Sequence, residues 1–92
     1  MHLLPFWVYV LYSLKDRGFY TGTTNNIFRR LAQHANGENK STINRRPLIL
    51  LYCEGHRSII DARRREQYFK TTKGRTMFRM ILRDSLDHLL KK

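Results

Sequence analysis

The chain has 92 residues, of which 18 are Lys or Arg and 7 are Asp or Glu, so its formal net charge is +11. A chain of this length supports one small hydrophobic core, and we expect a single domain over residues 1–92. So high a charge causes self-repulsion unless a polyanion neutralises it, which makes nucleic acid the first candidate partner. The basic residues lie among apolar ones, which indicates a folded domain with a basic surface rather than a disordered arm.

The cysteine content and the hydropathy pattern favour a cytoplasmic protein. Cys53 is the single cysteine and cannot form an internal disulfide, which is typical of a reducing compartment. The apolar start of the chain lacks the basic region of a signal peptide, and no apolar run approaches the roughly 20 residues that span a bilayer. We therefore expect a cytoplasmic location, nucleoid-associated if the source is bacterial, and no membrane partner.

The first part of the sequence predicts a β-hairpin. Residues 6–13 and 18–22 are rich in aromatic and β-branched side chains and are joined by a short polar link. If that link contains an even number of residues, Tyr9 faces Gly22, and Tyr20 then points from the same sheet face at diagonal-neighbour distance. An odd-numbered link would separate the two tyrosines.

A helix is expected directly after the hairpin. Asn25 and Asn26 can cap its start, and Gly37 follows its expected end near Asn36. The helix carries a polar stripe of residues spaced by four, which lies opposite to or flanks the apolar line of Ile27 and Leu31. The members of this stripe are Asn26, Arg30 and His34.

The second half predicts one strand and two helices. Residues 48–54 form a run apolar enough for a central strand, and Ser58 with Asp61 resembles a capping box that starts a helix to about Lys70. The apolar spacing after Gly74 indicates a last amphipathic helix. The element order is therefore β-β-α-β-α-α, and the fold class is α+β.

One acid on the helix after Ser58 is unusual. Ile59, Ala62, Glu66 and Phe69 recur at the spacing of a helix face that is turned toward the protein body. A carboxylate there is costly to desolvate unless a metal ion, an arginine or a proton accompanies it. Glu66 is therefore either part of a structural ion pair or a metal ligand.

Five positions in order resemble the GIY-YIG nuclease family over essentially the whole chain. They are Tyr9 in Trp7-Val8-Tyr9, Tyr20 in Tyr20-Thr21-Gly22, Arg30, His34 and Glu66. The segments 44–47 and 62–66 are similar to the small stand-alone branch that resembles the N-terminal domain of the excision-repair nuclease. Trp7 and Val8 replace the Gly and Ile of the family's first motif, and no late asparagine like that of the repair subunits is present.

The resemblance implies a three-stranded antiparallel sheet flanked by helices, with a catalytic site on one face. It implies hydrolysis of a phosphodiester bond with one divalent ion, Mg²⁺ or Mn²⁺. Tyr9 and Tyr20 are then the motif tyrosines, with Tyr9 as the base for the attacking water. Arg30 would hold the scissile phosphate, Glu66 would anchor the metal, and His34 would assist proton transfer or phosphate binding.

DNA is the expected partner, and five further residues are expected to contact it. Thr23 stands where the repair subunits carry a lysine, and Lys40, Arg45 and Arg46 lie in the connector beside the expected site. Arg63 lies in a basic run that is either a solvated helix face or a DNA contact. We expect the protein to recognise the shape of branched, nicked or flexible duplex DNA, because no recognition helix or second domain is present to read bases. We expect a monomer or weak homodimer.

Two hypotheses remain open at this stage. The first is a metal-dependent endonuclease of the DNA-repair type that is structure-selective or weakly sequence-specific. The second is a basic nucleic-acid-binding module that does not cleave, or a subunit of a larger DNA-processing complex. Both require salt-sensitive binding, so affinity alone does not distinguish them.

Overall fold

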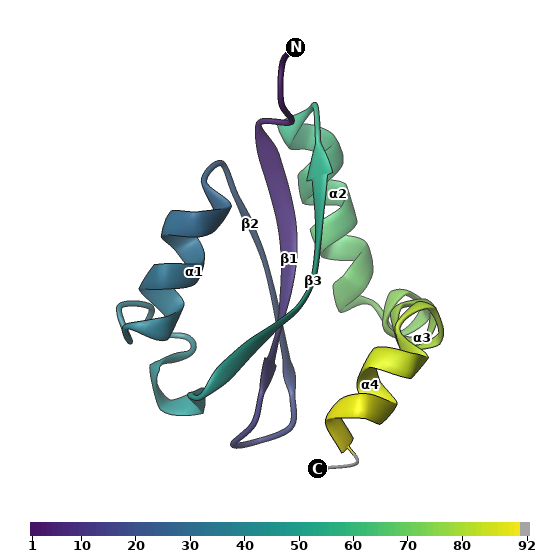
Figure 1. The fold of residues 1–92 in the computed structure, drawn as a ribbon. Coiled ribbons are helices and arrows are strands. Elements are labelled where there is room, and N and C mark those ends of the chain that lie inside the picture. Colours follow the sequence, from purple (N-terminus) through teal and green to yellow (C-terminus); the bar gives the residue numbers. More distant parts are fainter. Residues whose placement is uncertain (91–92) are drawn as a thin grey trace.

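Three antiparallel strands in the order β2-β1-β3 form the sheet of the computed structural model, which describes residues 1–90. The order β-β-α-β-α-α-α belongs to the α+β class (Figure 1). The elements are β1 (Phe6–Ser13), β2 (Phe19–Thr24), α1 (Ile27–Ala35), the 3₁₀ turn η1 (Ile43–Arg45), β3 (Leu48–His56), α2 (Ile59–Lys70), α3 (Thr72–Ile81) and α4 (Arg83–Leu90).

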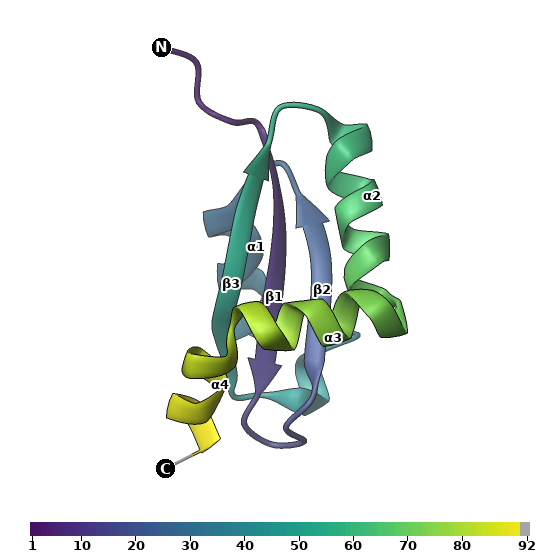
Figure 2. The ribbon, with the colours of Figure 1, turned by 90° about the vertical axis from the view of Figure 1, so that its right-hand side faces the viewer.

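The sheet separates α1 from the other helices. Figure 1 shows α1 on one side of the sheet and α2 with α3 on the other, and Figure 2 shows α3 running across the strands. Val8 and Val10 of β1 form the core with Ala62, Phe69 and Phe78 on the α2 and α3 side. Every helix within residues 1–90 is too short or too polar to cross a membrane.

The central strand is β1, and the expectation that the third strand lies centrally is wrong. Every residue from Val8 to Ser13 is buried, whereas the residues of β3 are half-buried or exposed. Both strands are apolar enough for a central position. The pairing of β2 with β1 through the hairpin leaves β3 at an edge.

The hairpin has the predicted register. Tyr9 pairs with Gly22 and Leu11 pairs with Tyr20, so the link of even length is confirmed. Ser13 fixes this link, because its hydroxyl accepts hydrogen bonds from the Lys15 and Asp16 amides. Tyr9 and Tyr20 therefore project from the same face.

The predicted helix starts are also confirmed. The Asn26 side chain accepts a hydrogen bond from the Arg29 amide, and the Ser58 side chain accepts from the Ile60 and Asp61 amides. Each cap satisfies backbone groups that have no partner inside the helix. Gly37 follows α1 with φ of 76°, a left-handed conformation that glycine adopts without strain.

The single last helix of the prediction is two helices. α3 begins at Thr72, with the Thr71 hydroxyl accepting from the Gly74 amide, and it ends before Leu82. Position 74 inside α3 requires glycine, because a Cβ there would stand 1.8 Å from the Tyr68 carbonyl oxygen. α2 and α3 therefore meet at a tight corner that the apolar spacing of the sequence does not indicate.

Candidate active site

The two motif tyrosines lie side by side over a glycine. Their ring centroids are 6.4 Å apart, and Tyr9 is only 1% exposed. A Cβ at Gly22 would lie 2.5 Å from the Tyr9 hydroxyl oxygen. The glycine of the second motif is therefore required by the tyrosine of the first, because the phenol packs directly on its backbone.

A buried chain of hydrogen bonds starts at the Tyr9 hydroxyl. It lies 2.8 Å from His34 Nε2, and His34 Nδ1 lies 2.7 Å from Thr42 Oγ1. His34 and Thr42 are 1% and 0% exposed, and the imidazole ring is also 5.2 Å from the Tyr20 ring. The His34 side chain therefore points from α1 toward the sheet, and its ring lies between the two tyrosines and Thr42.

Burial keeps this chain uncharged. It raises the pKa of Tyr9, an effect that Tyr20 increases and the nearby Arg30 charge opposes. Burial also lowers the pKa of His34, and Arg30 lowers it further. A neutral imidazole has one N–H, so His34 accepts a hydrogen bond from one neighbouring hydroxyl and donates to the other.

Thr42 is the member of this site that sequence reasoning missed. It lies in the connector between α1 and β3, where no periodicity predicts which side chains turn inward. A buried histidine needs partners for both ring nitrogens. That requirement could have pointed to a nearby hydroxyl, but not to Thr42 in particular.

Arg30 is placed to meet an anion. It precedes His34 by one turn of α1 and is half-buried, and its charge acts on both Tyr9 and His34. Within residues 1–90 its guanidinium forms no ion pair. A guanidinium that lies beside two neutral rings and has no carboxylate partner can bind a phosphate or carboxylate ligand.

Glu66 is the inward acid, and its cation is a lysine. One carboxylate oxygen accepts a hydrogen bond from the Thr23 hydroxyl, and the other lies 2.6 Å from Lys70 Nζ. Burial opposes ionisation of this carboxyl, but the hydrogen bonds from Lys70 and Thr23 lower the pKa of Glu66. The ion pair is therefore with Lys70, one turn along α2, rather than with an arginine.

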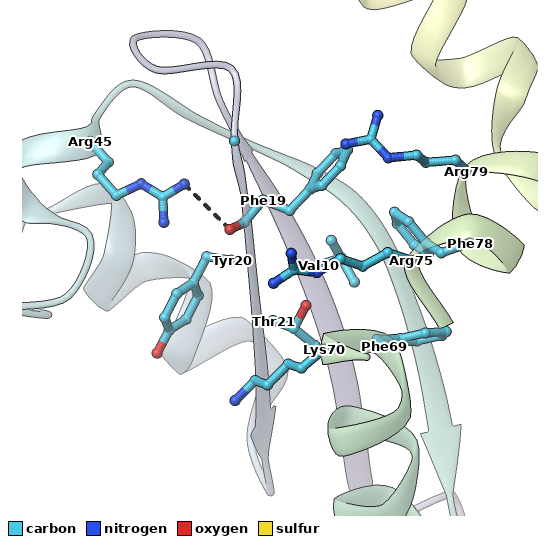
Figure 3. Close-up of a pocket in the computed structure, with 11 residues that line it drawn as sticks. Val10, Phe19, Tyr20, Thr21, Arg45, Phe69, Lys70, Arg75, Phe78 and Arg79 are labelled. Carbon is cyan, nitrogen blue, oxygen red and sulfur yellow. Dashed lines mark hydrogen bonds between the residues drawn. The ribbon is translucent and has the colours of Figure 1, made fainter. Parts of the chain in front are cut away.

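The acid and the tyrosines lie on opposite faces of the sheet. Thr23 pairs with Val8, whose side chain is in the core under α2, whereas Gly22 pairs with Tyr9 on the α1 side. The expectation of a site on one face is therefore wrong. In Figure 3 the Lys70 amine and the Tyr20 hydroxyl both point toward the carboxyl end of β2, the free edge of the sheet. Burial raises the pKa of Tyr9 and the Glu66 charge raises it further, so the acid acts on the tyrosine although the two project from opposite faces.

Of the predicted DNA contacts, Thr23 and Arg45 lie along the β2 edge, and each is engaged by an acid. Arg45 pairs with Asp16 at 2.6 Å and holds the pKa of that carboxyl at about 2, and Arg46 donates to backbone oxygens at the end of α1 and in η1. Lys40 and Arg63 are exposed, and Thr23 is engaged by Glu66. A DNA-contacting role for these residues stays a prediction.

Comparison with known proteins identifies the family. The model of the GIY-YIG catalytic domain matches residues 5–79. A UPF0213 protein of Staphylococcus haemolyticus is 40% identical over 76 residues, covering 82% of this chain and 92% of the relative. A UPF0213 protein of Limosilactobacillus reuteri is 37% identical over 87 residues, covering 91% and 90%. No solved structure gives a significant match. The chain belongs to the GIY-YIG family, a family of nucleases.

Proposed function

We propose that this protein is a metal-dependent endonuclease that hydrolyses phosphodiester bonds in DNA. The observation that carries this proposal is the buried Tyr9–His34–Thr42 chain of hydrogen bonds beside Arg30, a guanidinium that forms no ion pair within residues 1–90. Membership of a nuclease family makes the expected anion a backbone phosphate. The net charge of +11 favours the same partner.

Arg30 is assigned to the scissile phosphate. Its planar guanidinium can donate two parallel hydrogen bonds to phosphate oxygens and keeps its charge throughout the reaction. The lowered pKa of His34 and the raised pKa of Tyr9 leave Arg30 as the charged group among them. A phosphate bound here would replace solvent as the partner of this charge.

Tyr9 and His34 are assigned to proton transfer. As the Tyr9 oxygen takes a proton from the attacking water, the Tyr9 proton passes to His34 Nε2, so neither a free phenolate nor a free hydroxide forms. His34 Nδ1–H then donates to Thr42, which fixes the orientation of the ring. Burial disfavours the imidazolium that results, and the negative charge of a phosphate on Arg30 would offset that cost.

Glu66 is the residue assigned to the metal ion. Within residues 1–90 no three His, Cys, Asp or Glu side chains cluster as a metal site, and Glu66 is the carboxylate that lies beside Thr23 of β2. This fits an Mg²⁺ or Mn²⁺ ion that is shared with substrate phosphate, because Mg²⁺ is commonly held by one or two carboxylates and keeps several waters. The ion would neutralise charge that develops on the phosphate. Since Lys70 already pairs with Glu66, we expect loose metal binding without DNA.

A second candidate is a basic module that binds nucleic acid without cleaving it. The specific observation in its favour is that Lys70 neutralises Glu66 in the free protein while burial raises the pKa of Tyr9. In that case the fold is retained but the acid has become structural. Tight, salt-sensitive binding with no metal-dependent product would favour this candidate.

Cleavage of structured DNA tests the proposal. Purified protein is incubated with branched, flapped, nicked and plain duplex DNA, with Mg²⁺, Mn²⁺ or EDTA. We expect metal-dependent products with the wild type and with Glu38→Gln, an exposed acid in the connector after α1, and none with Glu66→Gln. Equal cleavage by the wild type and Glu66→Gln would contradict the assignment of this carboxylate.

A further inference from the structure

A cationic pocket lies between the outer edge of β2 and helix α3. It has a volume of about 440 Å³ and continues along β2 from Tyr20 (Figure 3). Four cations line it from separate parts of the chain: Arg45, Lys70, Arg75 and Arg79. A pocket with this volume is large enough for one nucleotide.

Two of these cations have no acid to neutralise them. Asp16 pairs with Arg45 and Glu66 pairs with Lys70, but within residues 1–90 Arg75 and Arg79 form no ion pair. They are spaced by four residues on α3, a helix without any acidic side chain, and like charges at this spacing repel. An anionic ligand would relieve this repulsion.

The pocket also offers surfaces for a planar group. The Arg79 guanidinium lies 4.9 Å from the centre of the Phe19 ring, and Tyr20 stands half-exposed at the other end. Unpaired bases stack on aromatic rings and guanidinium planes, whereas the bases of an intact duplex are already stacked on their neighbours. The combination of cations and rings therefore suits a phosphate with an unpaired base.

The pocket is continuous with the candidate active site. Tyr20 lines the pocket and lies beside Tyr9 and His34, and Lys70 lines the pocket and pairs with Glu66. A strand that places one phosphate at Arg30 can therefore follow the free edge of β2 into the pocket. The side chains on this path are polar, basic or aromatic.

We propose that the cationic pocket formed by Arg75, Arg79 and Phe19 binds an unpaired nucleotide of the strand whose phosphodiester lies at Arg30. This inference rests on the proposed nuclease function, because it takes nucleic acid as the substrate. It makes a duplex with a single-stranded overhang or flap the preferred DNA structure. Blunt duplex then binds through the general basic surface alone.

Binding in EDTA tests the pocket without requiring cleavage. Fluorescence anisotropy is measured for a labelled duplex with a single-stranded overhang and for the same duplex with blunt ends. We expect the wild type to bind the overhang about tenfold more tightly, and Arg75→Gln/Arg79→Gln to remove that preference. The matched control Arg64→Gln/Arg83→Gln removes the same charge from exposed positions outside the pocket and should weaken both DNAs equally.

Two outcomes would overturn the inference. The first is an overhang preference that survives in Arg75→Gln/Arg79→Gln, and the second is a wild type without any preference. All four arginines are exposed, so thermal unfolding should be the same in the variants, and this is checked first. Cleavage that persists after the preference is lost leaves the nuclease assignment standing. A wild type that prefers the overhang but cleaves no DNA overturns the nuclease assignment alone.

Discussion

Close packing between Tyr9 and Gly22 fixes the position of the candidate base. The substitution Gly22→Ala places a methyl group 2.5 Å from the Tyr9 hydroxyl, so the phenol must move away from His34. We expect a loss of about 1–3 kcal/mol in the free energy of unfolding, measured by urea denaturation. Gly18→Ala is the matched control, because its nearest contact is the far end of the long Arg45 side chain at the surface rather than a buried ring, and it should cost less. A similar loss in both variants would contradict the steric explanation.

The buried His34 gives the fold a pH dependence of known sign. Its folded pKa is lowered from the ordinary 6.5, so the unfolded chain binds more protons below that pH. The free energy of unfolding should therefore be constant above about pH 7 and fall as the pH drops from about 6.5 toward 5. The substitution His34→Gln should flatten this part of the profile, measured by chemical denaturation at each pH. Parallel profiles for the two proteins would show that another group causes the dependence.

At the scale of residues, the sequence predicts what local rules determine. The side of Tyr9 and Tyr20 follows from the parity of the hairpin link, and the structure confirms it. The partner of Glu66 is a lysine one helical turn away, whereas the helix pattern led us to expect an arginine or a metal ion. The sequence does not predict that Thr42 joins the site, because its position depends on how an irregular connector folds.

The corner between α2 and α3 is the element that positions the cationic pocket. Alanine normally favours a helix over glycine by about 1 kcal/mol. Gly74→Ala should nevertheless destabilise the fold by about 2–4 kcal/mol, because its Cβ would clash with the Tyr68 carbonyl oxygen at 1.8 Å and the backbone cannot yield easily. Thermal unfolding measures the effect. A melting temperature at or above that of the wild type would show that the corner is not tight.

Helix starts and helix breaks differ in how far the sequence predicts them. Asn26 and Ser58 act through side-chain hydrogen bonds to their own backbone, so these starts are visible as local motifs. The break at Leu82 has no such motif, and the apolar spacing continues through it. It follows from the docking of α3 across the strands, which is a tertiary effect. The choice between β1 and β3 as central strand is likewise decided by pairing and not by composition.

The molecule is strongly basic, and the part of the chain described by the structure holds few ion pairs. Its net charge of +11 predicts that DNA affinity depends strongly on salt. If about 6 to 10 phosphates are neutralised, the affinity should fall roughly 10³- to 10⁵-fold between 50 and 200 mM salt. Fluorescence anisotropy with one duplex at several salt concentrations measures this slope. An affinity that barely changes would contradict binding through the basic surface.

The sequence does not predict that the site is arranged around an edge of the sheet. The family resemblance placed the tyrosines, Arg30 and Glu66 together, and the helix period turned Glu66 inward. Neither indicates which face of the sheet α2 covers. The structure places α2 opposite α1, so the free edge of β2 becomes the path between the phenols and the carboxylate.

The cleavage rate of Tyr9→Phe tests the central claim most directly. Phenylalanine keeps the ring that packs on Gly22 and removes only the hydroxyl that bonds to His34. Under single-turnover conditions with Mn²⁺ and overhang DNA, we expect cleavage to fall about 100-fold or more while DNA affinity stays near the wild-type value. Because His34 Nε2 loses its buried partner, the variant should also lose about 1–3 kcal/mol of stability, so the assay is run well below its melting temperature. Cleavage at the wild-type rate would show that the Tyr9–His34 pair does not carry the proton transfer.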